Sequence, residues 1–180
     1  TYCVYNAIEG ARYRLKSPAR VADEVAEAVG EAGVSAIEFV DSTFNIPLEH
    51  ALAVCRELIA RGLRAEFSTM GINPGAVTPE LFALLREANF TEVSITPESA
   101  APAVLKGLGK SFTAEDIARA AELARGSRLP VVWYFLFGGP GETEATVRQT
   151  LAFIERHVPR EHLVLMVCGV RVFRGAPLEG

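Results

Sequence analysis

The sequence lacks the features of several large classes of protein. It has no run of Lys or Arg, and its net charge of −4 disfavours a general nucleic-acid or membrane-surface binder. No apolar stretch approaches the roughly 20 residues that a helix needs to span a bilayer. The first residues have neither the basic start nor the apolar core of a signal peptide. These absences predict a cytoplasmic protein with no nucleic-acid or membrane partner.

Cysteine and histidine are too few and too scattered to form an obvious metal site within the chain. The three cysteines, Cys3, Cys55 and Cys168, form no closely spaced pair, and an odd number favours reduced thiols over disulfides. Cys55 lies in a helical pattern and Cys168 in an apolar strand, so we expect both to be small core residues. The three histidines show no metal-ligand spacing either. Cys3 is the remaining candidate ligand.

The sequence does contain a regular alternation of helix and strand patterns. The expected helices are 18–32, 48–61, 79–88, 101–108, 114–125 and 144–157, and the expected strands are 34–41, 63–69, 92–96, 131–137 and 163–173. Strands separated by helices predict βαβ units and a parallel sheet. A complete eight-stranded barrel needs about 250 residues. The pattern therefore predicts one α/β domain, either a partial barrel or an open sheet.

Polar residues and glycines collect where the expected strands end. These segments are 41–45, 68–71, 96–99 and 138–143, with Arg171 on the last strand. Ligands of parallel α/β folds bind at the carboxyl ends of the strands, so we expect a small-molecule site there. Glu98 is a strong candidate, because a carboxylate directly after an apolar strand needs water, a cation or a donor.

The glycine cluster 138–141 is the most specific single feature. Glycines let a backbone approach a ligand closely, and the helix that follows offers free N–H groups. The same residues also suit a tight strand-to-helix turn with Thr143 as the N-cap. The cluster matches neither the P-loop nor the dinucleotide pattern, so it does not predict a nucleotide-triphosphate or nicotinamide site.

Five segments together resemble the radical S-adenosylmethionine (radical SAM) family, in particular members that carry a cobalamin-binding domain. The segments are Tyr2-Cys3 with 13–18, then 38–45, Glu98-Ser99 with 104–110, 137–143 and 170–173. Tyr2-Cys3 is similar to the end of the family signature Cys-x-x-x-Cys-x-aromatic-Cys. The order and distances of the segments match the family along essentially the whole chain. Phe135 departs from the pattern, which has glycine at that position.

The resemblance implies a [4Fe–4S] cluster and SAM as cofactors, with cobalamin as a further candidate. In the family, three cysteine thiolates bind three irons, and SAM chelates the fourth iron and is cleaved to a 5′-deoxyadenosyl radical. Cys3 would be the third cysteine, with the other two before Thr1. The resemblance also implies that residues 1–180 form a partial (β/α)6 barrel of the TIM type. Its first strand would lie before Thr1, and the rest of a longer polypeptide would complete the barrel.

The resemblance also assigns roles to residues at the strand ends. Asp41 and Ser42 would receive the methionine amino group, and Glu98 and Ser99 would bind polar atoms of the ribose or methionine. The remaining implied SAM contacts, beside the adenine or the SAM carboxylate, are Phe137, Gly138, Gly139, Glu142 and Arg171. The reaction would be radical initiation or cobalamin-assisted methyl transfer on a small-molecule or peptide substrate.

Two alternatives from other classes stay open. One is a SAM-binding scaffold domain without catalysis. The other is an ordinary α/β-barrel enzyme that uses Glu98 as a base and the glycine turn at 138–142 for phosphate.

An incomplete barrel has exposed edge strands, and this property can be tested directly. We expect residues 1–180, expressed alone, to aggregate, because unpaired strand edges recruit other chains. Size-exclusion chromatography and thermal melting measure this. A monodisperse product with one cooperative melting transition would contradict the expectation.

Overall fold

A single parallel sheet organises the molecule. The computed structural model describes residues 8, 10, 12–176, 178 and 179. The strands are β1 (Ala36–Phe39), β2 (Glu66–Ile72), β3 (Phe90–Glu98), β4 (Val131–Phe137) and β5 (Leu163–Cys168). All neighbours are parallel, and the spatial order β1-β2-β3-β4-β5 is the chain order. This order is that of a barrel, whereas the order of a doubly wound sheet reverses at its switch point. The predicted partial α/β barrel is confirmed.

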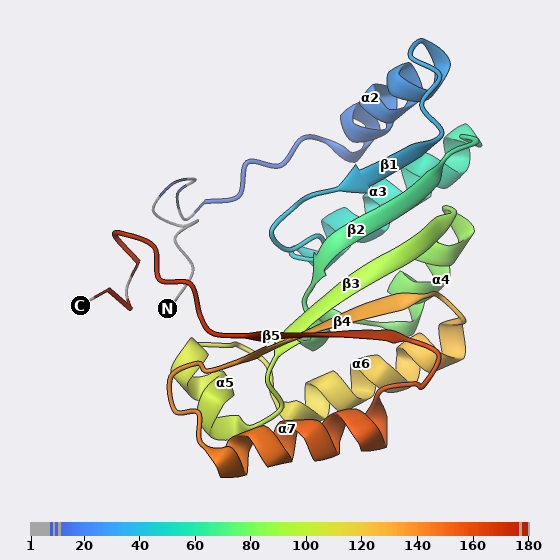
Figure 1. Ribbon diagram of the computed structural model, residues 1–180. Coiled ribbons are helices and arrows are strands. Elements are labelled where there is room, and N and C mark those ends of the chain that lie inside the picture. The colour runs from blue at the N-terminus through green and yellow to red at the C-terminus, as the bar shows by residue number, and fades with distance from the viewer. Residues whose placement is uncertain (1–7, 9, 11, 177, 180) are drawn as a thin grey trace.

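The helices form one layer against one face of the sheet (Figure 1). They are α2 (Pro18–Gly30), α3 (Leu48–Arg61), α4 (Pro79–Glu87), α5 (Pro102–Leu108), α6 (Ala114–Ser127) and α7 (Glu144–His157), with a short 3₁₀ helix, η1 (Pro74–Ala76). Contacts run from α2 to α3, α3 to α4, α4 to α6 and α6 to α7, as in the outer ring of a barrel. Within the described part of the chain, no helix has both the length and the apolar surface needed to cross a membrane.

Local signals set most helix boundaries. The side chains of Ser17, Thr78, Thr113 and Thr143 each accept a hydrogen bond from a backbone N–H in the first turn of the following helix. These bonds satisfy donors that have no partner within the helix. At the other end of α3, Gly62 adopts a left-handed conformation with φ 60° and stops the helix.

The core lies between the helices and one face of the strands. Alternate strand residues, including Phe67, Val93, Ile95 and Trp133, are almost fully buried and pack against apolar helix residues. Near the carboxyl end of β1, Phe39 stacks on Phe90 with ring centroids 5.7 Å apart, within a larger aromatic cluster. The opposite face of the sheet carries no helix in the described residues, so each strand presents a covered and an uncovered side.

Several expected segment bounds differ by a few residues from the structure, and three expectations have a clear structural reason for their correction. Strand β2 begins at Glu66, not at residue 63, because pairing of Ala36 with Glu66 starts the β1–β2 ladder. Strand β5 ends at Cys168, because Gly169 turns the chain with φ 94°. Cys168 is exposed and not a core residue, since it ends a strand at the edge of the described sheet. The other thiol, Cys55, is buried as expected, and burial raises its pKa to about 12.

A buried indole depends on a partly exposed histidine for its hydrogen bond. Trp133 is fully buried in β4, and its Nε1–H donates to Nδ1 of His162 over 3.1 Å. Burial lowers the pKa of His162, Arg125 acts in the same direction, and Glu161 opposes them. Because Nδ1 accepts this bond, protonation of Nδ1 would break it.

We therefore expect stability to fall in mild acid. A histidine with a folded-state pKa below its unfolded value of about 6.5 stabilises the fold above that value, and this contribution is lost as pH falls through the folded pKa. His162→Leu should remove this pH dependence and lower the free energy of unfolding by about 1–3 kcal/mol at pH 8, because the indole N–H loses its acceptor. Calorimetric melting of the full polypeptide from pH 8 to pH 5 measures both effects. An unchanged pH profile in the variant would contradict them.

Candidate functional site

A pocket of about 1140 Å³ opens at the carboxyl edge of the sheet. The strands run from right to left in Figure 1, toward the side where segments 12–17 and 169–176 also lie. The pocket is lined by segment 12–16, by β1 and the β1–α3 loop, by residues of α2 and α3 that face β1, and by Glu98 and segment 109–112. Its position agrees with the expected small-molecule site.

The loop that carries Asp41 and Ser42 is held by the backbone of β2. Gly71 has φ 71°, and a Cβ atom there would lie 2.5 Å from the carbonyl oxygen of Ser42. The N–H of Phe44 donates to the carbonyl of Gly71 over 3.2 Å. The loop therefore lies against β2 at a distance that only glycine permits.

Asn45 ties the same loop to the segment after β2. Its side chain is fully buried, and Nδ2 donates to the carbonyls of Asn73 and Ala76 over 2.9 and 3.0 Å. Its Oδ1 accepts from the N–H of Asn73 over 2.8 Å. All three bonds go to backbone groups, so Asn45 fixes the spacing of two neighbouring loops. Asn45 was predicted only as part of the polar segment 41–45, with no role of its own, although an amide close to Asp41 and Ser42 was a usable signal.

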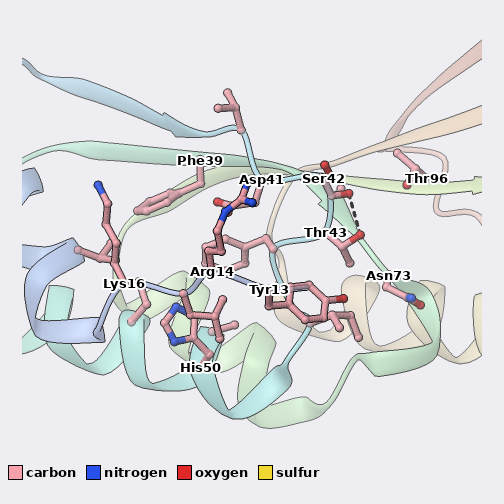
Figure 2. Close-up of a pocket in the computed structure, with 18 of the residues that line it drawn as sticks. Tyr13, Arg14, Lys16, Phe39, Asp41, Ser42, Thr43, His50, Asn73 and Thr96 are labelled. Atoms are coloured by element: carbon pink, nitrogen blue, oxygen red, sulfur yellow. Dashed lines mark hydrogen bonds between the residues drawn. The ribbon is translucent and has the colours of Figure 1, made fainter. Parts of the chain in front are cut away.

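Asp41 and Ser42 are exposed at the pocket. Figure 2 shows the side chain of Arg14 pointing toward Asp41, with His50 of α3 below it. The hydroxyl of Thr43 donates to the carbonyl of Ser42 over 2.8 Å. A carboxylate and a hydroxyl on adjacent residues can together accept hydrogen bonds from an ammonium group.

Glu98 pairs with Lys110 across the pocket wall. Their side chains are only 14% and 17% exposed and form an ion pair. Glu98 has φ 65°, a conformation that non-glycine residues rarely adopt and that concentrates at functional sites. Lys110 reaches Glu98 because the chain turns back at Gly109, which ends α5 in a left-handed conformation. The ammonium also lies 5.7 Å from the ring centre of Phe112. Lys110 was not among the predicted site residues.

The Ser99 side chain points away from the pocket and into the protein. It is 1% exposed, and its Oγ lies 3.0 Å from Oγ1 of Thr150 in α7. The N–H of Ala101 donates to the same Oγ over 3.1 Å. In this structure the Ser99 hydroxyl joins the start of α5 to α7, and its contact with SAM stays a prediction.

The glycine turn after β4 is closed by Glu142. Its carboxylate accepts from the N–H of Gly138 over 3.2 Å and from the hydroxyl of Thr146 over 2.7 Å. Helix α5 packs tightly on this turn, because a Cβ on Gly107 would lie 2.3 Å from the carbonyl oxygen of Pro140. Both carboxylate oxygens of Glu142 therefore accept hydrogen bonds from the turn and from the first turn of α7.

The predicted site residues that the structure describes fall into three groups. Asp41, Ser42 and Glu98 line the common pocket. The residues at the β3–α5 and β4–α7 connections, outside that pocket lining, are Ser99, Phe137, Gly138, Gly139 and Glu142. Arg171 lies beyond the end of β5, with its guanidinium 5.8 Å from the ring centre of Phe173. Cys3 lies outside the described residues. Among those that are described, no three His, Cys, Asp or Glu side chains could hold a metal ion.

Comparison with known proteins gives a consistent result. The model of the Radical SAM superfamily matches residues 1–154. An uncharacterized methyltransferase of Pyrococcus horikoshii is 26% identical over 155 residues, which are 86% of this chain and 34% of the relative. The anaerobic magnesium-protoporphyrin IX monomethyl ester cyclase of Cereibacter sphaeroides is 30% identical over 142 residues, which are 77% of this chain and 23% of the relative. The chain thus spans about a third or less of these curated relatives.

A solved structure resembles nearly all of the chain. It is the radical S-adenosylmethionine methyltransferase TsrM from Kitasatospora setae, with cobalamin and a [4Fe-4S] cluster bound. The TM-score is 0.88 at 27% identity, and the match covers 98% of this chain and 33% of TsrM.

The Gly71 contact makes a prediction with a matched control. Gly71→Ala should lower the free energy of unfolding by about 2–4 kcal/mol, because it adds a backbone clash to the left-handed strain. Gly62→Ala has a similar φ of 60° and nothing within 4 Å of the added Cβ. It should cost only about 1 kcal/mol. Denaturant titration of both variants of the full polypeptide tests this, and equal losses would contradict it.

Proposed function

The chain belongs to the radical SAM superfamily, and from this membership we propose that it is the cofactor-binding core of an enzyme that performs cobalamin-dependent methyl transfer. The observation that carries the proposal is the pocket at the strand ends, where Asp41, Ser42 and the Glu98–Lys110 pair converge. The likeness to a cobalamin-binding methyltransferase along 98% of the chain supports the reaction class.

The pocket residues fit the chemistry of SAM. Asp41 and Ser42 offer acceptors for its ammonium group, and the Glu98 carboxylate offers an acceptor for a ribose hydroxyl. Lys110 holds that carboxylate at the wall through the ion pair, which leaves it little freedom to rotate away. We propose that Phe137, Gly138 and Gly139 border the adenine, where apolar surface and backbone groups suit a flat base.

In this proposal Ser99 and Glu142 are positioning residues. Ser99 joins α5 to α7, and Glu142 closes the turn at Gly138. Arg171 lies after β5 and is exposed. Its guanidinium would pair with the SAM carboxylate if segment 169–176 folds over the pocket.

The cluster part of the proposal depends on Cys3 and on residues outside this chain. A thiolate at Cys3 would bind one iron, and two further thiolates would have to come from elsewhere in the longer polypeptide. When bound, the reduced cluster would supply the electron for reductive cleavage of SAM to methionine and a 5′-deoxyadenosyl radical, whereas methyl transfer to cobalamin would leave S-adenosylhomocysteine. The chain's own contribution is to hold SAM at the sheet edge and to limit access of water to it.

Radical initiation without methyl transfer is a second candidate function. This second candidate is supported by the 30% identity to an anaerobic cyclase, because that relative is not named as a methyltransferase. The two reactions leave different products of SAM: methyl transfer yields S-adenosylhomocysteine, and radical initiation yields 5′-deoxyadenosine. We propose a cytoplasmic enzyme with a small-molecule or peptide substrate in either case.

The experiment that tests the function is anaerobic reconstitution of the full-length protein with iron, sulfide and cobalamin. We expect a brown protein that converts SAM to S-adenosylhomocysteine in the presence of a reductant, and Cys3→Ser should lose most of the iron and the cluster absorbance. Formation of 5′-deoxyadenosine alone would favour radical initiation. A colourless wild-type protein that forms neither product would favour the scaffold alternative.

Glu98 makes a quantitative prediction. Glu98→Gln should weaken SAM binding about tenfold, which corresponds to about 1.4 kcal/mol for the loss of a charged acceptor. Glu87→Gln, an exposed carboxylate at the end of α4, is the control and should bind SAM like the wild type. Equilibrium dialysis with labelled SAM measures both, and circular dichroism checks that the variants are folded. Unchanged affinity in Glu98→Gln would contradict the assignment.

A further inference from the structure

The pocket has two halves, and they follow strands that have β2 between them. Asp41 and Ser42, which we call the ammonium half, come after β1. Glu98, which we call the adenosyl half, ends β3. The spatial order of these strands is β1, β2, β3. The segment that follows β2 is the short helix η1 (Pro74–Ala76), so η1 is suited to hold the two halves at a fixed distance.

One side of η1 is hydrogen-bonded to the β1–α3 loop through Asn45. The Asn45 amide group donates to the carbonyls of Asn73, the N-cap of η1, and of Ala76, its last residue. The N–H of Asn73 donates back to Oδ1 of Asn45, and Oδ1 of Asn73 accepts from the N–H of Gly75 over 2.8 Å. Because Asn45 is fully buried, water does not weaken these bonds. A displacement of η1 would therefore carry the loop with it.

The other side of η1 touches the segment that holds the adenosyl half. A Cβ on Gly75 would lie 2.9 Å from Cβ of Phe112 and 3.8 Å from its Cα. Phe112 is 7% exposed and belongs to the hydrophobic core, so close packing fixes its position. Two residues earlier, Lys110 pairs with Glu98, and its ammonium lies 5.7 Å from the Phe112 ring centre.

Gly75 is required by space and not by backbone conformation. It lies in the 3₁₀ helix η1, and other residues adopt that conformation as readily. A methyl group at this position would meet Phe112, which the core holds in place, so η1 would have to move away. The missing side chain thus sets how closely η1 approaches the segment of Lys110.

We propose that η1 sets the distance between the two halves of the SAM site, with Asn45 and Gly75 as positioning residues. A ligand that spans two subsites gains from both only when their separation matches its own length. A ligand that occupies one subsite is insensitive to that separation. This inference rests on the proposed function, because it takes the pocket to hold SAM.

The test compares SAM with 5′-methylthioadenosine, which has the adenosyl group and lacks the amino acid. Gly75→Ala should displace η1 and, through Asn45, the β1–α3 loop. We expect it to weaken SAM binding about tenfold and to change methylthioadenosine binding by less than about twofold. Equilibrium dialysis of the reconstituted full-length protein with each labelled compound measures both. Gly126→Ala in α6, where nothing lies within 4 Å of the added Cβ, is the control and should change neither affinity.

Asn45→Ala is a second variant that acts from the other side of η1. It removes the three bonds to η1 and should weaken SAM binding about tenfold, again with methylthioadenosine binding within about twofold of the wild type. In this background Gly75→Ala should weaken SAM binding by less than about a further twofold, because the displaced η1 no longer carries the loop. Circular dichroism checks that each variant is folded.

The outcomes separate this inference from the proposed function. Equal weakening of both compounds in Gly75→Ala would overturn the inference, because it indicates general damage to the pocket. Unchanged SAM affinity in either folded variant would overturn it, and so would effects that multiply in the double variant. A wild type that binds SAM but not methylthioadenosine would overturn it as well, since the adenosyl half would then not act as a separate subsite. If the wild type binds neither compound, the proposed function fails with it.

Discussion

The close contact between Gly71 and the carbonyl of Ser42 is the constraint on which the carboxyl edge depends. It places the β1–α3 loop directly on β2, where Asn45 can reach the backbone of the next loop. The same device recurs where Gly107 lets α5 approach Pro140. In both places a missing side chain lets two backbones meet, and the loops at the strand ends are held without a ligand.

Polar side chains at this edge divide into those that support backbone and those that are available to a ligand. Asn45, Ser99 and Glu142 make their hydrogen bonds within the protein. Asp41 and Ser42 stay exposed, and Glu98 is held by Lys110. A preorganised site needs both kinds, because a ligand-binding group is useful only when its neighbours keep it in place.

Features of the fold with a local signal could be predicted from the sequence, and features that depend on residues far apart in the chain could not. Helix α3 and strand β4 begin and end at the predicted residues, since proline, glycine and apolar runs mark them. The start of β2 was wrong because pairing with β1 decides it. The contact of Ser99 with Thr150 could not be predicted, because the two residues are 51 positions apart. Lys110 was missed for a related reason, since only the turn at Gly109 brings it to Glu98.

Among the described residues, each strand hydrogen-bonds with the strands before and after it in the chain, so β3 has two further strands on either side. Amide protons of β3 should therefore be among the slowest to exchange with solvent. The middle strand β3, which ends in Glu98, would then be the most rigid part of the sheet, and the outer strands would move relative to it.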